Sequence, residues 1–127
     1  MRVVDTSVWI ETLVGSRFGQ DLLRELPAED EWLMPTIVQL EISKWLLRET
    51  QNDLHDRIIA FSMTLQLIPL DASIALEAAL LCRTLRLATA DAIVLASARV
   101  HHAELLTCDS HFEGIPGVLY RAKPKDL

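Results

Sequence analysis

The segment from residue 2 to residue 14 reads RVVDTSVWIETLV, and its pattern is the starting point for predicting the fold. The β-branched run Arg2–Val4 is typical of a short strand. Asp5 follows at once, and the apolar residues from Ser7 to Leu13 indicate a helix for which Ser7 is a suitable N-cap. The chain therefore begins with a strand, an acid at the carboxyl end of that strand, and a helix.

The same alternation continues along the sequence. We predict further strands at 31–34, 66–69, 104–107 and 117–120, and helices at 17–26, 36–50, 53–63, 71–85 and 89–100. Thr36, Thr89 and either Asp71 or Ser73 are the expected N-caps of the later helices. The helix over 89–100 is apolar almost all round, so we expect it to be buried. Strands alternating with helices predict an α/β domain, a three-layer α/β/α arrangement around a central, mainly parallel sheet, formed by residues 1–127 as one domain.

Composition fits a globular protein but not an ordinary nucleic-acid-binding one. Half of the 127 residues are hydrophobic, and the formal net charge is −6. Proteins that bind phosphates are usually basic, so this charge argues against nucleic acid unless metal ions neutralise acids at the site or basic residues cluster. The candidates for such a cluster are Arg17, Lys44, Arg48, Arg83, Arg86 and Arg99.

The cysteines and the apolar segments indicate a reduced, soluble protein. Cys82 and Cys108 have no nearby cysteine or ligand-spaced histidine, which argues against a disulfide scaffold or a zinc site. The start of the chain lacks the apolar core of a signal peptide. The most apolar stretch, 88–100, contains two charged residues and is too short to span a bilayer. We expect a cytoplasmic protein with no membrane partner.

Three acids occupy positions that suggest chemistry. Asp5 and Asp109 follow predicted strands, and sites in open parallel sheets form beyond the carboxyl ends of strands. Taken singly, each is equally well explained as a turn residue or a helix cap. Asp91 lies in the first turn of the apolar helix. A carboxylate on a buried helix is costly unless it is paired or bound to a metal, so a functional role is favoured over a simple interaction with the helix dipole.

Glu41 is the fourth candidate acid. In a helix it projects between Ile37 and Trp45, toward the apolar side, although Lys44 is an alternative partner on the surface. Its helix also follows a strand, so all four carboxylates can meet at one edge of the sheet. Carboxylates that meet repel one another unless a pKa rises or a cation binds. Oxygen ligands without cysteine or histidine favour Mg²⁺, with Mn²⁺ as the alternative. Such a site can hydrolyse a phosphodiester with a metal-activated water.

Four segments of the sequence resemble, in order, the motifs of the PIN-domain family. They are VVDTSVWIE at 3–11, EIS at 41–43, TADAIVLASA at 89–98 and LLTCDSHF at 105–112. The closest likeness is to VapC-type toxins of bacterial type II toxin–antitoxin pairs. The resemblance implies a magnesium-dependent endoribonuclease, and it carries the catalytic and metal-binding roles onto Asp5, Glu41, Asp91 and Asp109.

The same resemblance implies further roles and partners. Thr107, Thr6 and Ser7 match polar positions that support the site. His111 stands where some relatives carry another acid, and it is either a phosphate contact or a loop residue without a role. The family implies homodimerisation, an RNA substrate and a cognate antitoxin. Transfer, ribosomal and messenger RNA are all compatible substrates. The candidates for hydrophobic contact with an antitoxin, each with core packing as the favoured alternative, are Trp9, Trp32, Trp45 and Leu46.

Three rival functions make different demands on these residues. A receiver-type signalling domain needs an acidic pair after the first strand and a lysine after the fifth, and the sequence has neither arrangement. A phosphatase with an aspartyl nucleophile needs a second acid at position 7, where Ser7 stands. The stronger alternative is a PIN-fold module that holds a partner protein or RNA without cutting it, and the intact set of carboxylates argues against it.

Overall fold

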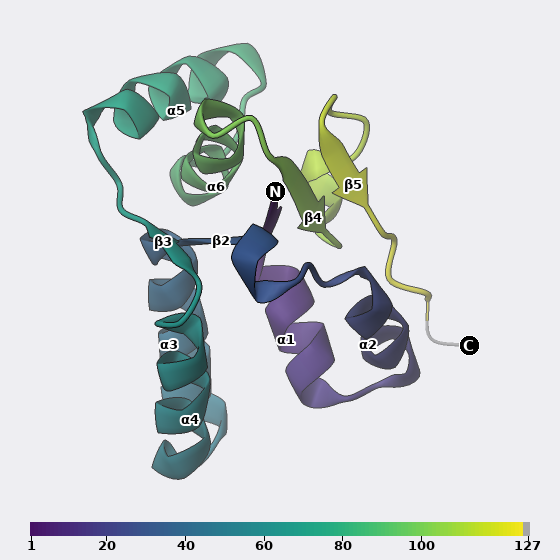
Figure 1. Cartoon of the computed structure of the whole chain (residues 1–127). Coiled ribbons are helices and arrows are strands. Elements are labelled where there is room, and N and C mark those ends of the chain that lie inside the picture. Colours follow the sequence, from purple (N-terminus) through teal and green to yellow (C-terminus); the bar gives the residue numbers. More distant parts are fainter. Residues whose placement is uncertain (126–127) are drawn as a thin grey trace.

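The computed structural model describes residues 1–125. Its strands form one sheet in the order β3-β2-β1-β4-β5, and every neighbouring pair is parallel. The first strand of the chain therefore lies at the centre of the sheet (Figure 1). The strands are β1 (Arg2–Val4), β2 (Trp32–Pro35), β3 (Gln66–Ile68), β4 (Glu104–Thr107) and β5 (Val118–Tyr120). The predicted parallel sheet is confirmed.

Helices cover both faces of this sheet. The chain moves outward from β1 to β3 and then returns across the sheet to β4. Right-handed crossovers in opposite directions place their helices on opposite faces. Figure 1 accordingly shows α5 and α6 on one side of the sheet and α1 to α4 on the other. The helices are α1 (Thr6–Val14), α2 (Arg17–Leu22), α3 (Thr36–Glu49), α4 (Asn52–Ser62), α5 (Ala72–Thr84) and α6 (Thr89–Val100). The three-layer α/β/α prediction is confirmed.

The core lies between the central strands and α6. Val3 and Val4 of β1 and Leu105 and Leu106 of β4 are fully buried. Helix α6 packs against β1, β2 and β4, and its alanines allow the helix to lie close to the sheet. Its buried residues are Ala92, Val94, Leu95, Ala96, Ser97 and Ala98. The prediction that this helix forms a buried layer is therefore confirmed.

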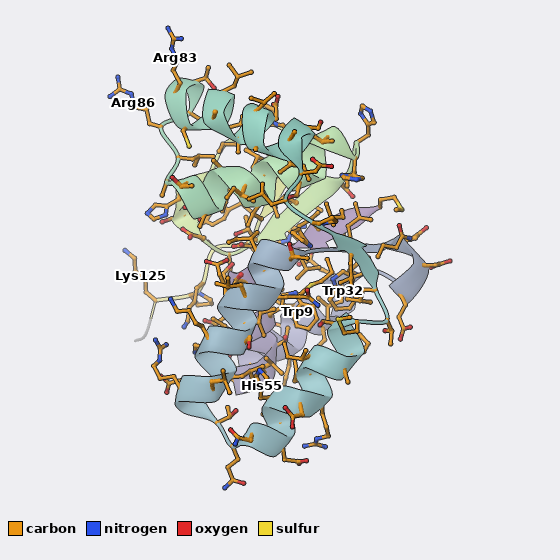
Figure 2. The ribbon with its side chains drawn as sticks, turned by 90° about the vertical axis from the view of Figure 1, so that its left-hand side faces the viewer. Trp9, Trp32, His55, Arg83, Arg86 and Lys125 are labelled. Atoms are coloured by element: carbon orange, nitrogen blue, oxygen red, sulfur yellow. The ribbon has the colours of Figure 1, made fainter. Side chains whose placement is uncertain are left out.

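Three aromatic rings, from α1, β2 and α4, form a second cluster in the core. Trp9 and Trp32 (Figure 2) have ring centroids 5.0 Å apart. Phe61 contacts both rings edge-on. Trp9, Trp32 and Leu46 are buried in the core, so the idea that they contact an antitoxin at the surface is wrong, and the alternative of core packing holds. Trp45 is only partly buried. Within residues 1–125, none of the helices combines the length and the apolar character that crossing a membrane requires.

Several helix boundaries differ from the prediction. Asp5, not Ser7, is the N-cap residue of α1, and Pro35 and Ala88 rather than Thr36 and Thr89 precede α3 and α6. Asp71 does cap α5, because its side chain accepts from the amide of Ile74 at 2.9 Å. Helix α2 ends at Leu22 and continues as a 3-10 turn, Leu23–Glu25. Pro27 then disfavours helical backbone in the residue before it, Leu26, which is extended.

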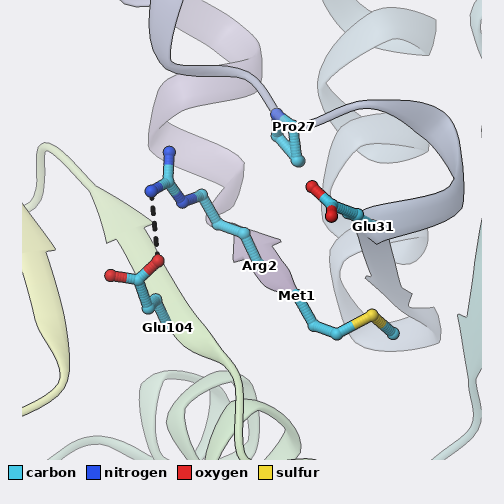
Figure 3. Close-up of a pocket in the computed structure, with 5 residues that line it drawn as sticks. All are labelled: Met1, Arg2, Pro27, Glu31 and Glu104. Carbon is cyan, nitrogen blue, oxygen red and sulfur yellow. Dashed lines mark hydrogen bonds and ion pairs between the residues drawn. The ribbon is translucent and has the colours of Figure 1, made fainter.

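The register of the two central strands is fixed at their amino ends. Arg2 pairs with Glu104 at 3.1 Å (Figure 3). The guanidinium of Arg2 also donates to the carbonyl of Glu25 at 2.6 Å. Met1, Pro27 and Glu31 line the same hollow. The register sets Arg2 beside Glu104 and Val4 beside Leu106. One residue further along each strand, it brings Asp5 next to Thr107 at the opposite edge of the sheet.

Candidate active site

Asp5 is a buried carboxylate at the end of the central strand. Its side chain is 5% exposed, and its Oδ2 accepts from the hydroxyls of Ser7 at 2.7 Å and Thr107 at 2.8 Å. Burial raises the pKa of Asp5 to about 6, against the lowering effect of these two hydroxyl bonds. The nearby carboxylates of Glu41 and Asp91 also raise the pKa of Asp5. Asp5 is therefore a carboxylate whose negative charge is poorly compensated within the protein.

The hydroxyls of Ser7 and Thr107 join the ends of β1 and β4. Besides donating to Asp5, Thr107 Oγ1 accepts from the amide of Asp109 at 3.0 Å, and Ser7 Oγ accepts from the amide of Cys108 at 3.2 Å. Each hydroxyl thus donates its proton to the buried acid and accepts from a backbone amide in the segment that follows β4. The network holds Asp5 and Asp109 in a fixed relation, although they are far apart in sequence.

Asp91 and Asp109 lie close together, at the start of α6 and after β4. Asp91 lies in the first turn of α6, and Asp109 begins the 3-10 turn Ser110–Phe112. Burial raises the pKa of Asp91, the charge of Asp109 raises it further, and His111 lowers it. One ligand atom from each of Asp91, Asp109 and His111 lies within 4.8 Å of the others.

Glu41 approaches from α3. Its Oε1 accepts from the hydroxyl of Thr6 at 2.8 Å, and Thr6 directly follows Asp5 in the chain. Glu41 is partly buried, as predicted from its place on the helix, and it binds Thr6 rather than relying on Lys44. The charge of Glu41 raises the pKa of Asp5, and the bond from Thr6 ties Glu41 to the residue that follows Asp5. The structure therefore brings all four predicted acids to the carboxyl edge of the sheet.

The donor set suits a divalent cation. Removing a carboxylate from water is costly unless positive charge compensates it, and Asp5 lies close to two further acids. The sequence-based expectation was a site of oxygen ligands only, but the structure adds the imidazole of His111. His111 was the residue whose role the sequence left open. Its position two residues after Asp109 is the available signal, because an Asp side chain that accepts from the amide two residues on brings the two residues together.

The basic candidates do not form one patch. Lys44 and Arg48 line a hollow beside Glu41, together with Trp45. Arg86 lines a second hollow on the side of Asp91 and His111. Figure 2 shows the side chains of Arg83 and Arg86 projecting away from the body of the molecule.

The remaining two candidates lie in other surroundings. Arg17 lines a hollow with Lys123 and Lys125. Arg99 lies in the last turn of α6, away from Asp91, and donates to the carbonyl of Pro116 at 3.5 Å. The acids are therefore flanked by two separate basic hollows.

Solved structures with the same fold come from toxin–antitoxin systems. A toxin–antitoxin complex from Klebsiella pneumoniae is 27% identical, with a TM-score of 0.81, over 94% of this chain and 96% of that one. FitAcB from Neisseria gonorrhoeae is 22% identical, with a TM-score of 0.75, over 87% and 89% of the two chains. VapC20 from Mycobacterium tuberculosis, a sarcin–ricin loop cleaving toxin, is 18% identical, with a TM-score of 0.72, over 91% and 95%. No curated protein matches the sequence closely enough to be recognised as a relative.

The family assignment rests on nearly the whole chain. The PIN domain matches residues 2–118, a range that includes all four acids and the strands and helices that position them. The resemblance predicted from four short motifs is therefore confirmed, and the chain belongs to the PIN domain family.

Proposed function

We propose that this protein is a metal-dependent endoribonuclease and the toxin of a toxin–antitoxin pair. The observation that carries the proposal is the convergence of Asp5, Glu41, Asp91 and Asp109 at the carboxyl edge of a parallel sheet. Mg²⁺ is the expected cofactor and Mn²⁺ the alternative. The toxin–antitoxin complex from Klebsiella pneumoniae, which has the same fold, supports the role as a toxin.

Each acid has a distinct task in this proposal. Ser7 and Thr107 both bind Oδ2 of Asp5, so Oδ1 is the oxygen that remains for an ion. The hydroxyl of Thr6 holds Glu41 Oε1, so Oε2 is the oxygen of Glu41 that remains for an ion. A bound divalent ion would lower the pKa of the attacking water and stabilise charge on the phosphodiester oxygens. Asp109 is held by the amide of His111, which leaves its carboxylate facing Asp91 across the site.

The surroundings of the acids favour a single RNA strand as substrate. Trp45 is partly exposed beside Lys44 and Arg48, and aromatic rings next to basic side chains suit stacked bases and phosphates. Arg86 offers a second phosphate contact on the far side of Asp91. A strand that passes from one hollow to the other crosses the four carboxylates. This path explains how a protein with a net charge of −6 can bind RNA locally.

The partners in this proposal are the RNA, a cognate antitoxin and a second copy of the chain. The complex from Klebsiella pneumoniae supports the antitoxin, and the loop-cleaving toxin from Mycobacterium tuberculosis supports structured RNA with an exposed loop as substrate. Such loops present unstacked bases, which proteins read more readily than an RNA duplex. The proposed location is the cytoplasm, where RNA and antitoxin are both present.

The test is cleavage of a mixed RNA pool by the antitoxin-free protein with Mg²⁺, in the presence and absence of EDTA. Asp5→Asn and Asp91→Asn should abolish the cuts, whereas Asp71→Asn, which changes an acid that caps α5, should not. Cuts that survive EDTA or either site variant would contradict the proposed mechanism. A protein that binds RNA or a partner but leaves the pool intact would instead be the non-cutting binding module.

A further inference from the structure

His111 lies beside two of the acids. Its side chain is 70% exposed, yet its Nδ1 lies 3.3 Å from Asp91 Oδ2 and 3.3 Å from Asp109 Oδ1. The backbone sets this position, because the amide of His111 donates to Asp109 Oδ1 at 2.9 Å and the next residue, Phe112, is fully buried. The turn Ser110–Phe112 thus presents the imidazole to the two carboxylates.

We propose that His111 is a metal ligand, and that Nδ1 of His111 with carboxylate oxygens of Asp91 and Asp109 forms a mixed nitrogen–oxygen site that prefers Mn²⁺ to Mg²⁺. This inference rests on the metal site of the proposed function and specifies which ion that site selects. It departs from the all-oxygen site that the four acids alone would form.

The distances fit one shared ion. Ligand atoms on an octahedral ion with bonds of about 2.1 Å lie about 3 to 4 Å apart. The 3.3 Å separations agree with that spacing, and all three ligand atoms lie within 4.8 Å of one another. The adjoining hollow, which Arg86 and Ala88 also line, leaves room for water or a phosphate oxygen as further ligands.

The chemistry of the donors determines the preference. Mg²⁺ binds oxygen ligands and keeps much of its water, whereas imidazole nitrogen is a better ligand for first-row transition ions. Replacing one oxygen ligand with a nitrogen therefore weakens Mg²⁺ binding more than it weakens Mn²⁺ binding. A charged imidazole paired with the two acids would explain the same distances without any bond between metal and nitrogen, so the deciding observation is that bond itself.

Pulsed electron paramagnetic resonance of the full chain loaded with Mn²⁺ detects a directly bound nitrogen. We expect nitrogen coupling in the unchanged protein and its loss in His111→Ala, which should fold normally because the side chain is largely exposed. The control is His102→Asn at the far end of α6, where the residue has a φ of 54°, a conformation that asparagine tolerates. The control variant should keep the coupling.

Calorimetry provides the second measurement. His111→Asp should lower the ratio of Mn²⁺ affinity to Mg²⁺ affinity at least tenfold while still binding both ions. Mn²⁺ that binds without nitrogen coupling, or coupling that survives His111→Ala, would overturn the role of His111 and leave the proposed ribonuclease intact. A protein that binds neither ion would overturn both the role of His111 and the metal site of the proposed function.

Discussion

The hydroxyl of Thr107 donates to Asp5 Oδ2 at 2.8 Å across two neighbouring strands, and its oxygen accepts from the amide of Asp109 at 3.0 Å. One buried side chain therefore positions two of the four acids. Parallel pairing of β1 with β4 makes this contact possible, since it aligns residues that lie about a hundred positions apart in the chain.

Thr107→Val should impair both stability and cleavage. Valine has nearly the same shape but leaves a buried acceptor and a backbone amide without their partner, at a cost of about 1–3 kcal/mol. We also expect at least a tenfold loss of RNA cleavage, because Asp5 and Asp109 lose their common support. Thr107→Ser should retain most of the stability and most of the RNA cleavage. Urea unfolding and cleavage assays measure the two effects, and a fully active valine variant would contradict the role assigned to this hydroxyl.

Asp5 should make the metal-free protein less stable as pH rises. Its pKa is raised from 3.8 to about 6, so between these values the folded state holds a proton that the unfolded state has released. Stability contributed by the protonated acid is present below about pH 4 and lost as pH rises through 6. The full effect is at most about 3 kcal/mol.

Asp5→Asn removes this dependence. In EDTA, the stability of the variant relative to the unchanged protein should increase from pH 4.5 to pH 7.5, as measured by urea unfolding at each pH. Stability curves that run parallel across this range would show that the charge of Asp5 is already compensated in the folded protein.

Divalent ions should stabilise the folded protein at pH 7.5. An ion at a hundred times its dissociation constant adds about 2.7 kcal/mol if it binds only the folded state. Thermal unfolding with and without Mn²⁺ should therefore show a clear rise in Tm, which Asp91→Asn should largely remove. Asp71→Asn is the matched control and should respond like the unchanged protein. An equal rise in all three proteins would mean that the ions bind elsewhere.

Lys44 and Arg48 should contribute to RNA binding through charge. The Asp91→Asn variant, which should not cleave RNA, is the starting protein. Changing both basic residues to glutamine in it should weaken RNA binding. It should also reduce the slope of log affinity against log salt by about 1.4, or about 0.7 for each contact with a single strand. Arg99→Gln, at the other end of α6, should leave the slope unchanged. Filter binding over a range of salt concentrations measures this slope. An unaltered slope in the double variant would place the RNA path elsewhere.

Gly19 should not tolerate a side chain. A Cβ at this position would lie 2.0 Å from the carbonyl oxygen of Glu11, where α2 crosses α1. Gly19→Ala should therefore destabilise the protein by about 1–3 kcal/mol through overpacking. Gln20→Ala, on the exposed side of the same helix, should change stability by less than about 0.5 kcal/mol. Chemical unfolding of the two variants compares them directly, and equal stabilities would show that the two helices can separate at little cost.

Local patterns were sufficient to predict most of the fold. The β-branched strand at Arg2–Val4 and the apolar helix at 89–100 carry their own periodicity, and acids at strand ends meet because parallel strands share an edge. Asp5, Asp91 and Asp109 were therefore accessible from the sequence, and the resemblance to the PIN domain supported the inclusion of Glu41.

Features that depend on distant contacts were not accessible in the same way. Ser7 has the chemistry of an N-cap, but its hydroxyl bonds to Asp5 and to the amide of Cys108, about a hundred residues away. The sequence favours core packing for Trp9 and Trp32, but it does not indicate that both rings contact Phe61. The approach of His111 to Asp91 depends on the placement of α6 beside the turn after β4. Such relations appear only when the complete chain is folded.

The central position of β1 has a consequence for the protein as it is synthesised. Its two hydrogen-bonding neighbours are β2 and β4, so β1 is paired on both sides only after residue 107 has followed it out of the ribosome. At translation rates of about 5–20 residues per second, that interval is roughly 5–20 s. Until Asp109 has been synthesised, the growing chain lacks at least one of the four acids. Under the proposed function, a chain that is still being synthesised would therefore be inactive toward the RNA around it.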